Sequence, residues 1–224
     1  MCGKFTQMMS WKEVHDLSEL TSTATAPDEI VTVTPMRMAK ILRLDASGTR
    51  ELVNMRWGWA GRGAKDPTGK PEFIHARIET LDVKPTFRDA FLHGNRGIAV
   101  VTTFNEGEEI SPSKTRQHVI TPRDGKPVAI VVLWERWTNC NEGELLTFVM
   151  VTTPPNRLIS KITERMPAVL GNADWSKWLG EERAGSDELK AMLKPFEGDW
   201  DMQAAGKPPP PPKPAKAKSQ PDLF

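Results

Sequence analysis

The residue with the most distinctive chemistry stands at position 2, where a cysteine follows the initiator methionine. A small residue here permits an aminopeptidase to remove Met1, after which Cys2 would carry an α-amine and a thiol on adjacent carbons. With reference pKa values of about 8 and about 8.5, both groups have usable nucleophilic fractions at neutral pH. An amine condenses with an aldehyde to an imine, and the neighbouring thiolate can then close a thiazolidine ring. Because ring closure is intramolecular, the pair predicts durable capture of an aldehyde. The alternative is that Cys2 is an accident of the second codon.

The other thiol and the histidines do not form the pattern of a metal centre. Cys140 lies between two asparagines and is interpreted as a loop thiol without a role. A cytosolic protein rarely keeps a disulfide, so we expect both cysteines to be free. The histidines lack metal-ligand spacing from the cysteines; they are His15, His75, His93 and His118. We therefore expect neither a metal nor another cofactor.

Composition indicates one compact domain. The chain has 224 residues, of which 38% are hydrophobic and 26% are charged, which is enough to build a core. The formal net charge is only +1, so any nucleic-acid site must be a local basic patch. No apolar run of about 18 residues predicts a membrane span, and the N-terminus lacks a signal-peptide apolar region. We expect a cytoplasmic protein without a membrane partner.

Hydrophobic patterning predicts an α+β fold, a single domain with a curled, antiparallel, barrel-like β core flanked by short helices. A capping box at Ser10–Glu13 opens an expected early helix, and three short helices are expected over Lys84–Leu92, Asp174–Leu179 and Ser186–Leu193. The strands outnumber the helices and follow one another like hairpins. They are expected at Ile30–Val33, Lys40–Leu44, Glu51–Trp57, Gly97–Thr103, Gln117–Ile120, Val128–Trp134 and Leu145–Thr152.

The C-terminal segment has a different character. Five consecutive prolines, Pro208–Pro212, stand among lysines and alanines that cannot bury a core, which indicates a disordered or polyproline spacer. We expect the domain to cover residues 1–202, the linker residues 203–219 and a terminal motif residues 220–224.

Eight segments, in order, resemble a known family. They are Met1–Phe5, Val33–Pro35, Met55–Trp59, Ile74–Thr80, Phe87–Phe91, Gly97–Glu106, Val149–Thr153 and Arg165–Leu170. The chain is similar over about residues 2–180 to the SRAP family, the SOS-response-associated or abasic-site-processing proteins. The resemblance implies a lyase-like protein that crosslinks itself to abasic sites in single-stranded DNA, forming a thiazolidine through Cys2 and protecting the lesion during replication and SOS repair. The ring-opened sugar of an abasic site supplies the aldehyde.

Two other functions stay open beside this one. The family name implies a cysteine-type autopeptidase, which would use the same Cys2 but needs a base and an oxyanion hole for a peptide substrate. A degenerate member could bind single-stranded DNA or a replication clamp without chemistry. For all three we expect a monomer that associates with the nucleoid or the replication fork.

The resemblance also assigns acid–base residues. Glu106 matches the glutamate that helps to open the deoxyribose ring; the alternative is a solvated charge, because Glu106 begins an acidic run. His75 replaces the usual asparagine and could hydrogen-bond to the cysteine or the sugar and titrate near neutral pH, or stay neutral without a proton role.

Thr163 departs from the family pattern, which has a proton-transferring histidine at this position. A threonine hydroxyl cannot act as a general base at neutral pH. Either His75 or Glu164 replaces that histidine, or the reaction is slower and less reversible. Our hypothesis is slow release of the crosslink.

A phosphate-binding track is expected at Lys4, Arg56, Arg77 and Arg165, with a salt bridge to Glu79 as the alternative for Arg77. Trp59 is expected either to stack beside the lesion or to pack in the core, whereas core packing is favoured for Trp57.

The last five residues, Gln220–Phe224, resemble the peptide with which bacterial proteins bind the sliding clamp. Leu223 and Phe224 would fill a hydrophobic pocket while Gln220 hydrogen-bonds beside it. The linker would deliver this anchor away from the domain and tether it at the fork; the alternative is an arbitrary tail.

Overall fold

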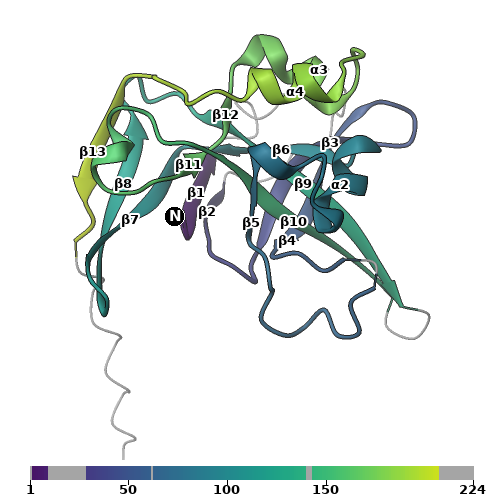
Figure 1. Cartoon of the computed structure of the whole chain (residues 1–224), viewed down its shortest axis with the longest axis horizontal. Coiled ribbons are helices and arrows are strands. Elements are labelled where there is room, and N and C mark those ends of the chain that lie inside the picture. Colours follow the sequence, from purple (N-terminus) through teal and green to yellow (C-terminus); the bar gives the residue numbers. More distant parts are fainter. Residues whose placement is uncertain (1, 10–28, 62, 140–142, 207–224) are drawn as a thin grey trace, which may run out of the picture.

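The computed structural model describes residues 2–9, 29–61, 63–139 and 143–206, which form a single α+β domain (Figure 1). Its helices are α2 (Pro85–Leu92), α3 (Trp175–Leu179) and α4 (Ser186–Met192), with 3-10 turns η1 (Ile78–Thr80), η2 (Ile159–Lys161) and η3 (Asn172–Asp174). Its strands are β1 (Lys4–Met9), β2 (Glu29–Val33), β3 (Met38–Leu44), β4 (Arg50–Trp57), β5 (His75–Arg77), β6 (Arg96–Val101), β7 (Thr103–Ser111), β8 (Lys114–Pro122), β9 (Val128–Asn139), β10 (Gly143–Thr153), β11 (Met166–Pro167), β12 (Val169–Leu170) and β13 (Trp200–Ala204).

The strands form two sheets, and the larger one closes on itself. It runs in the order β11-β10-β4-β3-β6-β9-β12, and a further pairing of β10 with β9 completes a ring. The smaller sheet is antiparallel, with the order β13-β8-β7-β1-β2. The predicted curled, barrel-like core is therefore confirmed. One exception to antiparallel pairing is β10, which runs parallel to β4 and to β5.

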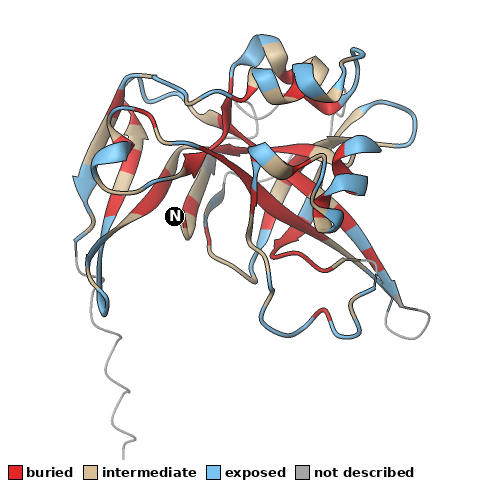
Figure 2. Ribbon diagram, viewed as in Figure 1, coloured by how far each residue is buried: buried red, intermediate tan, exposed pale blue. Residues whose placement is uncertain are grey.

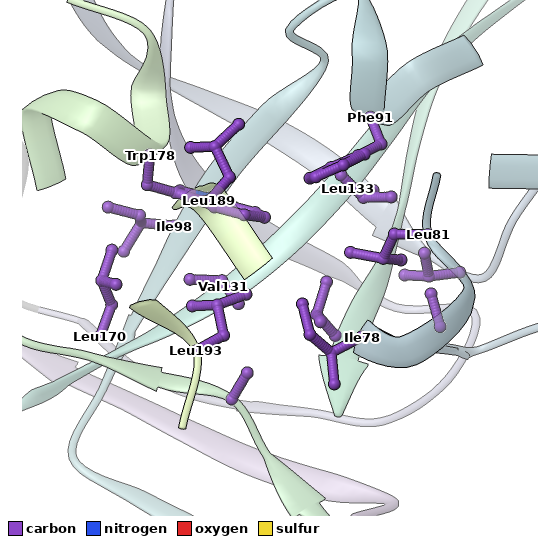
Figure 3. Close-up of a cluster of buried hydrophobic side chains, with 14 of the residues drawn as sticks. Ile78, Leu81, Phe91, Ile98, Val131, Leu133, Leu170, Trp178, Leu189 and Leu193 are labelled. Atoms are coloured by element: carbon purple, nitrogen blue, oxygen red, sulfur yellow. The ribbon is translucent and has the colours of Figure 1, made fainter. Parts of the chain in front are cut away.

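Alternate residues of the central strands enter two different cores. On β6, Ile98 belongs to one buried cluster and Ala99 to the other, and β9 and β10 divide their residues in the same way. Because side chains alternate between the faces of a strand, burial of both faces explains the continuous apolar runs of these strands (Figure 2). The helices cover the first cluster, where Trp178 and Leu189 lie beside Ile98 (Figure 3).

The second cluster joins the two sheets and contains Cys2. Phe5 of β1 and Phe104 of β7 meet Trp57 and Phe148 of the larger sheet there, all fully buried. Gln7 also connects the sheets: its side-chain nitrogen donates to the Lys40 carbonyl at 2.9 Å, and the backbone nitrogen of Lys40 donates to its side-chain oxygen at 3.1 Å. These contacts fix β1, and the start of β1 determines where Cys2 lies.

The expected strands and the three expected later helices are confirmed within a few residues. The sequence patterns did not predict the continuation of β7 beyond Thr103 as far as Ser111, nor the strands β1, β5, β11, β12 and β13. β13 extends to Ala204, inside the segment that was interpreted as linker. The helix expected at Ser10 and the loop around Cys140 lie outside the described residues, as do Gln220, Leu223 and Phe224.

Candidate active site at the N-terminus

Cys2 lies at the end of β1 between the two sheets, with 1% of its surface exposed. Its Sγ donates to the carbonyl of Lys4 at 3.4 Å. Burial and the nearby charge of Glu106 raise the pKa of this thiol far above its ordinary value. The expectation of a usable thiolate fraction at neutral pH is therefore wrong for the buried site. The thiol is protonated and requires a base at the moment of reaction.

Glu106 supplies a carboxyl group beside the nitrogen of Cys2. It lies on β7, is fully buried, and accepts a hydrogen bond from the backbone N–H of Cys2. Burial raises the pKa of Glu106 to about 7, while that hydrogen bond opposes the rise. The solvated-charge alternative is thus excluded. This nitrogen is the one that removal of Met1 would convert into an α-amine, and the carboxyl group lies against it.

His75 holds the other side of Cys2. It lies on β5, where pairing with Met150 of β10 sets its position, and its Nε2 is 2.7 Å from the carbonyl oxygen of Cys2. A carbonyl only accepts, so Nε2 carries the proton and donates. Burial lowers the pKa of His75 to about 4, so the ring is neutral above that pH. The structure therefore supports the neutral hydrogen-bonding alternative rather than titration near pH 7.

The two tryptophans of the Met55–Trp59 segment have different surroundings. Trp57 is fully buried, as expected, and its ring lies 5.2 Å from Phe5 and 6.0 Å edge-on to His75. Trp59 belongs to the other core cluster, packs edge-on against Phe87 at 5.2 Å and is 8% exposed. Of the two interpretations of Trp59, the structure favours core packing.

The four candidate phosphate ligands also differ. Arg56 is buried, and its guanidinium donates to the carbonyls of Pro67 and Gly58, so it presents no free face to a phosphate. Arg165 makes a bidentate salt bridge to Glu79, with N–O distances of 2.6 and 3.0 Å. Glu79 therefore pairs with Arg165 and not with Arg77, for which a salt bridge to Glu79 was the alternative. Arg77 is exposed and Lys4 is half-buried, and both adjoin Cys2 through β5 and β1.

Thr163 lies between η2 and β11 and is half-buried. Its backbone N–H donates to the carbonyl of Ile159 at 3.1 Å. Within the described part of the chain, no hydrogen bond joins its hydroxyl to Cys2, His75 or Glu106.

Sequence reasoning missed His118, whose Nε2 lies 2.8 Å from Glu108 and which stands opposite Glu106 in the pairing of β7 with β8. The position of His118 next to Glu106 follows only from the register of the two strands.

The described residues hold neither a cluster of metal ligands nor a membrane-spanning helix. Within residues 2–9, 29–61, 63–139 and 143–206, no group of three or more His, Cys, Asp or Glu side chains is arranged to hold a metal ion. In the same ranges, no helix has the length and apolar character that crossing a membrane requires.

Comparison with known proteins gave concordant matches. Residues 1–206 match the family model described as SOS response associated peptidase (SRAP). The abasic site processing protein YobE of Bacillus subtilis (strain 168) is 30% identical over 207 residues, covering 91% of this chain and 93% of YobE. YoqW of the same organism, also named an abasic site processing protein, is 29% identical over 206 residues, covering 91% of each chain. A crystal structure of a protein from Bordetella bronchiseptica has a TM-score of 0.73 at 21% identity, covering 92% of this chain and 100% of that one.

Proposed function

The chain belongs to the SOS response associated peptidase (SRAP) family, and from this premise we propose that it processes abasic sites in single-stranded DNA by linking itself to them covalently through Cys2. One observation carries the proposal: the nitrogen that becomes the α-amine of Cys2 lies against the buried carboxyl group of Glu106. An amine, a thiol and an acid in one pocket are the groups that capture of an aldehyde requires.

The reaction would begin at the α-amine. The amine adds to the sugar aldehyde, Glu106 protonates the departing hydroxyl, and water leaves as the C=N bond forms. The Cys2 thiol then adds to that carbon: the S–C bond forms, the π electrons of the protonated C=N bond move to nitrogen, and the thiol proton passes to the carboxylate of Glu106. Because the thiol is buried and protonated, it stays unreactive until the imine stands beside it. Glu106, once ionised, is the base that moves this proton.

His75 would orient Cys2 rather than exchange protons. Its Nε2–H···O bond to the Cys2 carbonyl persists after Met1 is removed, because that carbonyl belongs to the peptide bond with Gly3. With Glu106 on the nitrogen side and His75 on the carbonyl side, the reacting atoms are fixed before the DNA arrives. Exposed Arg77 and half-buried Lys4 are the proposed phosphate contacts, and Arg165 holds the turn η1 that follows β5 through its salt bridge to Glu79.

The geometry is less suited to the cysteine peptidase that the family name suggests. A peptidase thiol requires an adjacent base that takes its proton. Here the proton-bearing nitrogen of His75 is committed to the Cys2 carbonyl, and Glu106, whose pKa burial raises to about 7, becomes a base only after it has given its proton to the departing hydroxyl. We therefore place aldehyde capture first and retain peptide cleavage as an outcome of the test.

The test uses an oligonucleotide with one abasic site and a denaturing gel. The proposal predicts a covalent protein–DNA band that disappears in Cys2→Ala and persists in Cys140→Ala. Cleavage of protein substrates without that band would establish the peptidase instead. Binding that does not survive denaturation would establish a binding module without chemistry.

We further propose that the C-terminal residues Gln220–Phe224 bind the sliding clamp and that residues 203–219 act as the tether. A spacer rich in proline and lysine supports this role because it is extended and solvated. Tethering would keep the domain near single-stranded DNA during replication.

A further inference from the structure

The β7–β8 hairpin places a second titratable pair next to the site. In its register Phe104 stands opposite Ile120, and Glu106 stands opposite His118. Directly opposite residues of an antiparallel pair point to the same face, with Cβ atoms about 4.5–5.5 Å apart. Phe104 and Ile120 belong to the buried cluster that contains Cys2, so this face of the hairpin is the one that meets Cys2. β7 lies between β8 and β1 in the smaller sheet (Figure 1).

Polar side chains continue along this face toward the hairpin tip. His118 lies 2.8 Å from Glu108, and Arg116 lies 3.5 Å from the same carboxylate oxygen. Their exposure increases outward: Glu106 is 0% exposed, whereas the side chains of His118, Glu108 and Arg116 are 11%, 27% and 55% exposed. The row therefore leads from the buried carboxyl group to solvent.

The hydrogen bond to Glu108 defines which nitrogen of His118 can exchange a proton. A carboxylate accepts, so Nε2 donates, and in the neutral ring Nδ1 is left to take up a proton. Among the described residues, the charged or titratable groups that face His118 are Glu106 and Glu108 of β7 and Arg116 of its own strand. Its partner on β13 is Ala204, which does not titrate.

The proposed reaction releases a proton that must leave a buried site. The α-amine of a freed Cys2 has a reference pKa of about 8, so at neutral pH it starts mainly as an ammonium. Ammonium, thiol and aldehyde give a thiazolidine, one water and one proton. Glu106, beside the nitrogen, receives this proton, but the fully buried carboxyl group cannot pass it directly to bulk solvent.

We propose that His118, oriented by Glu108, relays protons between Glu106 and solvent during crosslink formation. In this proposal His118 acts through Glu106, so it is a positioning residue: it sets the protonation state of the catalytic acid. Directly opposite residues lie close enough for a ring and a carboxyl group to exchange a proton, either directly or through one water. This inference rests on the proposed aldehyde capture.

The test measures single-turnover crosslinking by the full chain between pH 5.5 and 8.5, at low buffer concentration. His118→Gln keeps a donor for Glu108 but cannot take up a proton, and His118→Ala leaves space for imidazole. His93→Ala is the matched control, because His93 is exposed at the C-terminal end of α2 and its ring Nδ1 bonds to the backbone carbonyl of Asp89. Thermal unfolding and binding of an oligonucleotide with a tetrahydrofuran analogue verify folding and DNA affinity.

We expect His118→Gln to slow crosslinking about tenfold and to alter its pH profile, imidazole to restore the rate of His118→Ala, and His93→Ala to match the wild type. An unchanged rate and pH profile in His118→Gln would overturn the relay, as would a loss in His118→Ala that imidazole does not restore. Absence of any Cys2-dependent band in the wild type would instead refute the proposed function itself.

Discussion

Burial gives the carboxyl group of Glu106 a higher pKa in the folded chain than in the unfolded chain. In the native protein Glu106 keeps its proton up to a pKa of about 7, whereas its ordinary value is 4.5. The native state therefore binds more protons than the unfolded state between these values. The associated stability is fully present below pH 4.5 and is lost as the pH rises through about 7.

Replacing Glu106 by glutamine should remove this loss of stability at higher pH. The amide side chain of Glu106→Gln does not ionise. The free energy of unfolding of this variant, relative to that of the wild type, should therefore increase by about 1–3 kcal/mol between pH 4.5 and pH 8. Urea unfolding at both pH values measures the difference. Crosslinking should fall about 100-fold or more in the same variant, because the acid is lost. Parallel stability profiles for the two proteins would contradict a buried, proton-holding Glu106.

His75 should be replaceable by another donor. Asparagine can donate to the Cys2 carbonyl as Nε2 does, so His75→Asn should crosslink within about threefold of the wild type, whereas His75→Ala leaves that carbonyl without its partner at a cost of about 1–3 kcal/mol. Since the pKa of His75 is about 4, both the wild type and His75→Asn should have the same pH profile above pH 5.5. A profile that changes near pH 6.5 in His75→Asn would show that His75 titrates during the reaction.

The identity of Cys2 and Glu106 as candidates was predictable, but their ionisation was not. Residue types and the family resemblance indicate an aminothiol and an acid. The high pKa of the thiol depends on burial between two sheets, which no local pattern contains. The register that places His118 opposite Glu106 is equally invisible before the strands pair.

At the scale of elements, the segment between η2 and β11 carries the departure from the family pattern. Thr163 has no base to offer, so we expect the crosslink to release slowly. Thr163→His should speed recovery of free protein from purified crosslink, measured by the decay of the covalent band, while Ser160→His in η2 serves as a surface control. Equal decay in wild type and Thr163→His would count against this hypothesis.

The elements differed in how predictable they were. β6, β9 and β10 are buried on both faces, and their long apolar runs identify them. β1 reads Lys-Phe-Thr-Gln-Met-Met and lacks such a run, because the polar side chain of Gln7 is used to bond to the other sheet. The outer half of β7 is rich in glutamate and looks like a loop until β8 pairs with it. Closure of the ring by β9 and β10 depends on contacts between distant segments.

At the scale of the whole molecule, a net charge of +1 gives weak long-range attraction to DNA. Local recruitment by the C-terminal motif would compensate for that weakness. Deleting residues 220–224 should abolish capture of the protein by immobilised sliding clamp and leave crosslinking to an abasic oligonucleotide in solution unchanged. A matched chain with Gln220, Leu223 and Phe224 retained but Lys213→Ala should still be captured. Clamp capture by the truncated chain would refute the proposed motif.

The central claim is that a freed N-terminal aminothiol makes the bond, and intact-mass spectrometry tests it most directly. Crosslinked protein is denatured, treated with iodoacetamide and digested with nuclease. The chain has two cysteines, so free protein should gain two alkyl groups, whereas the crosslinked protein should lack Met1 and gain one, at Cys140, because the Cys2 sulfur is held in the ring. Crosslinked protein that retains Met1, or that is alkylated at both cysteines, would contradict the account.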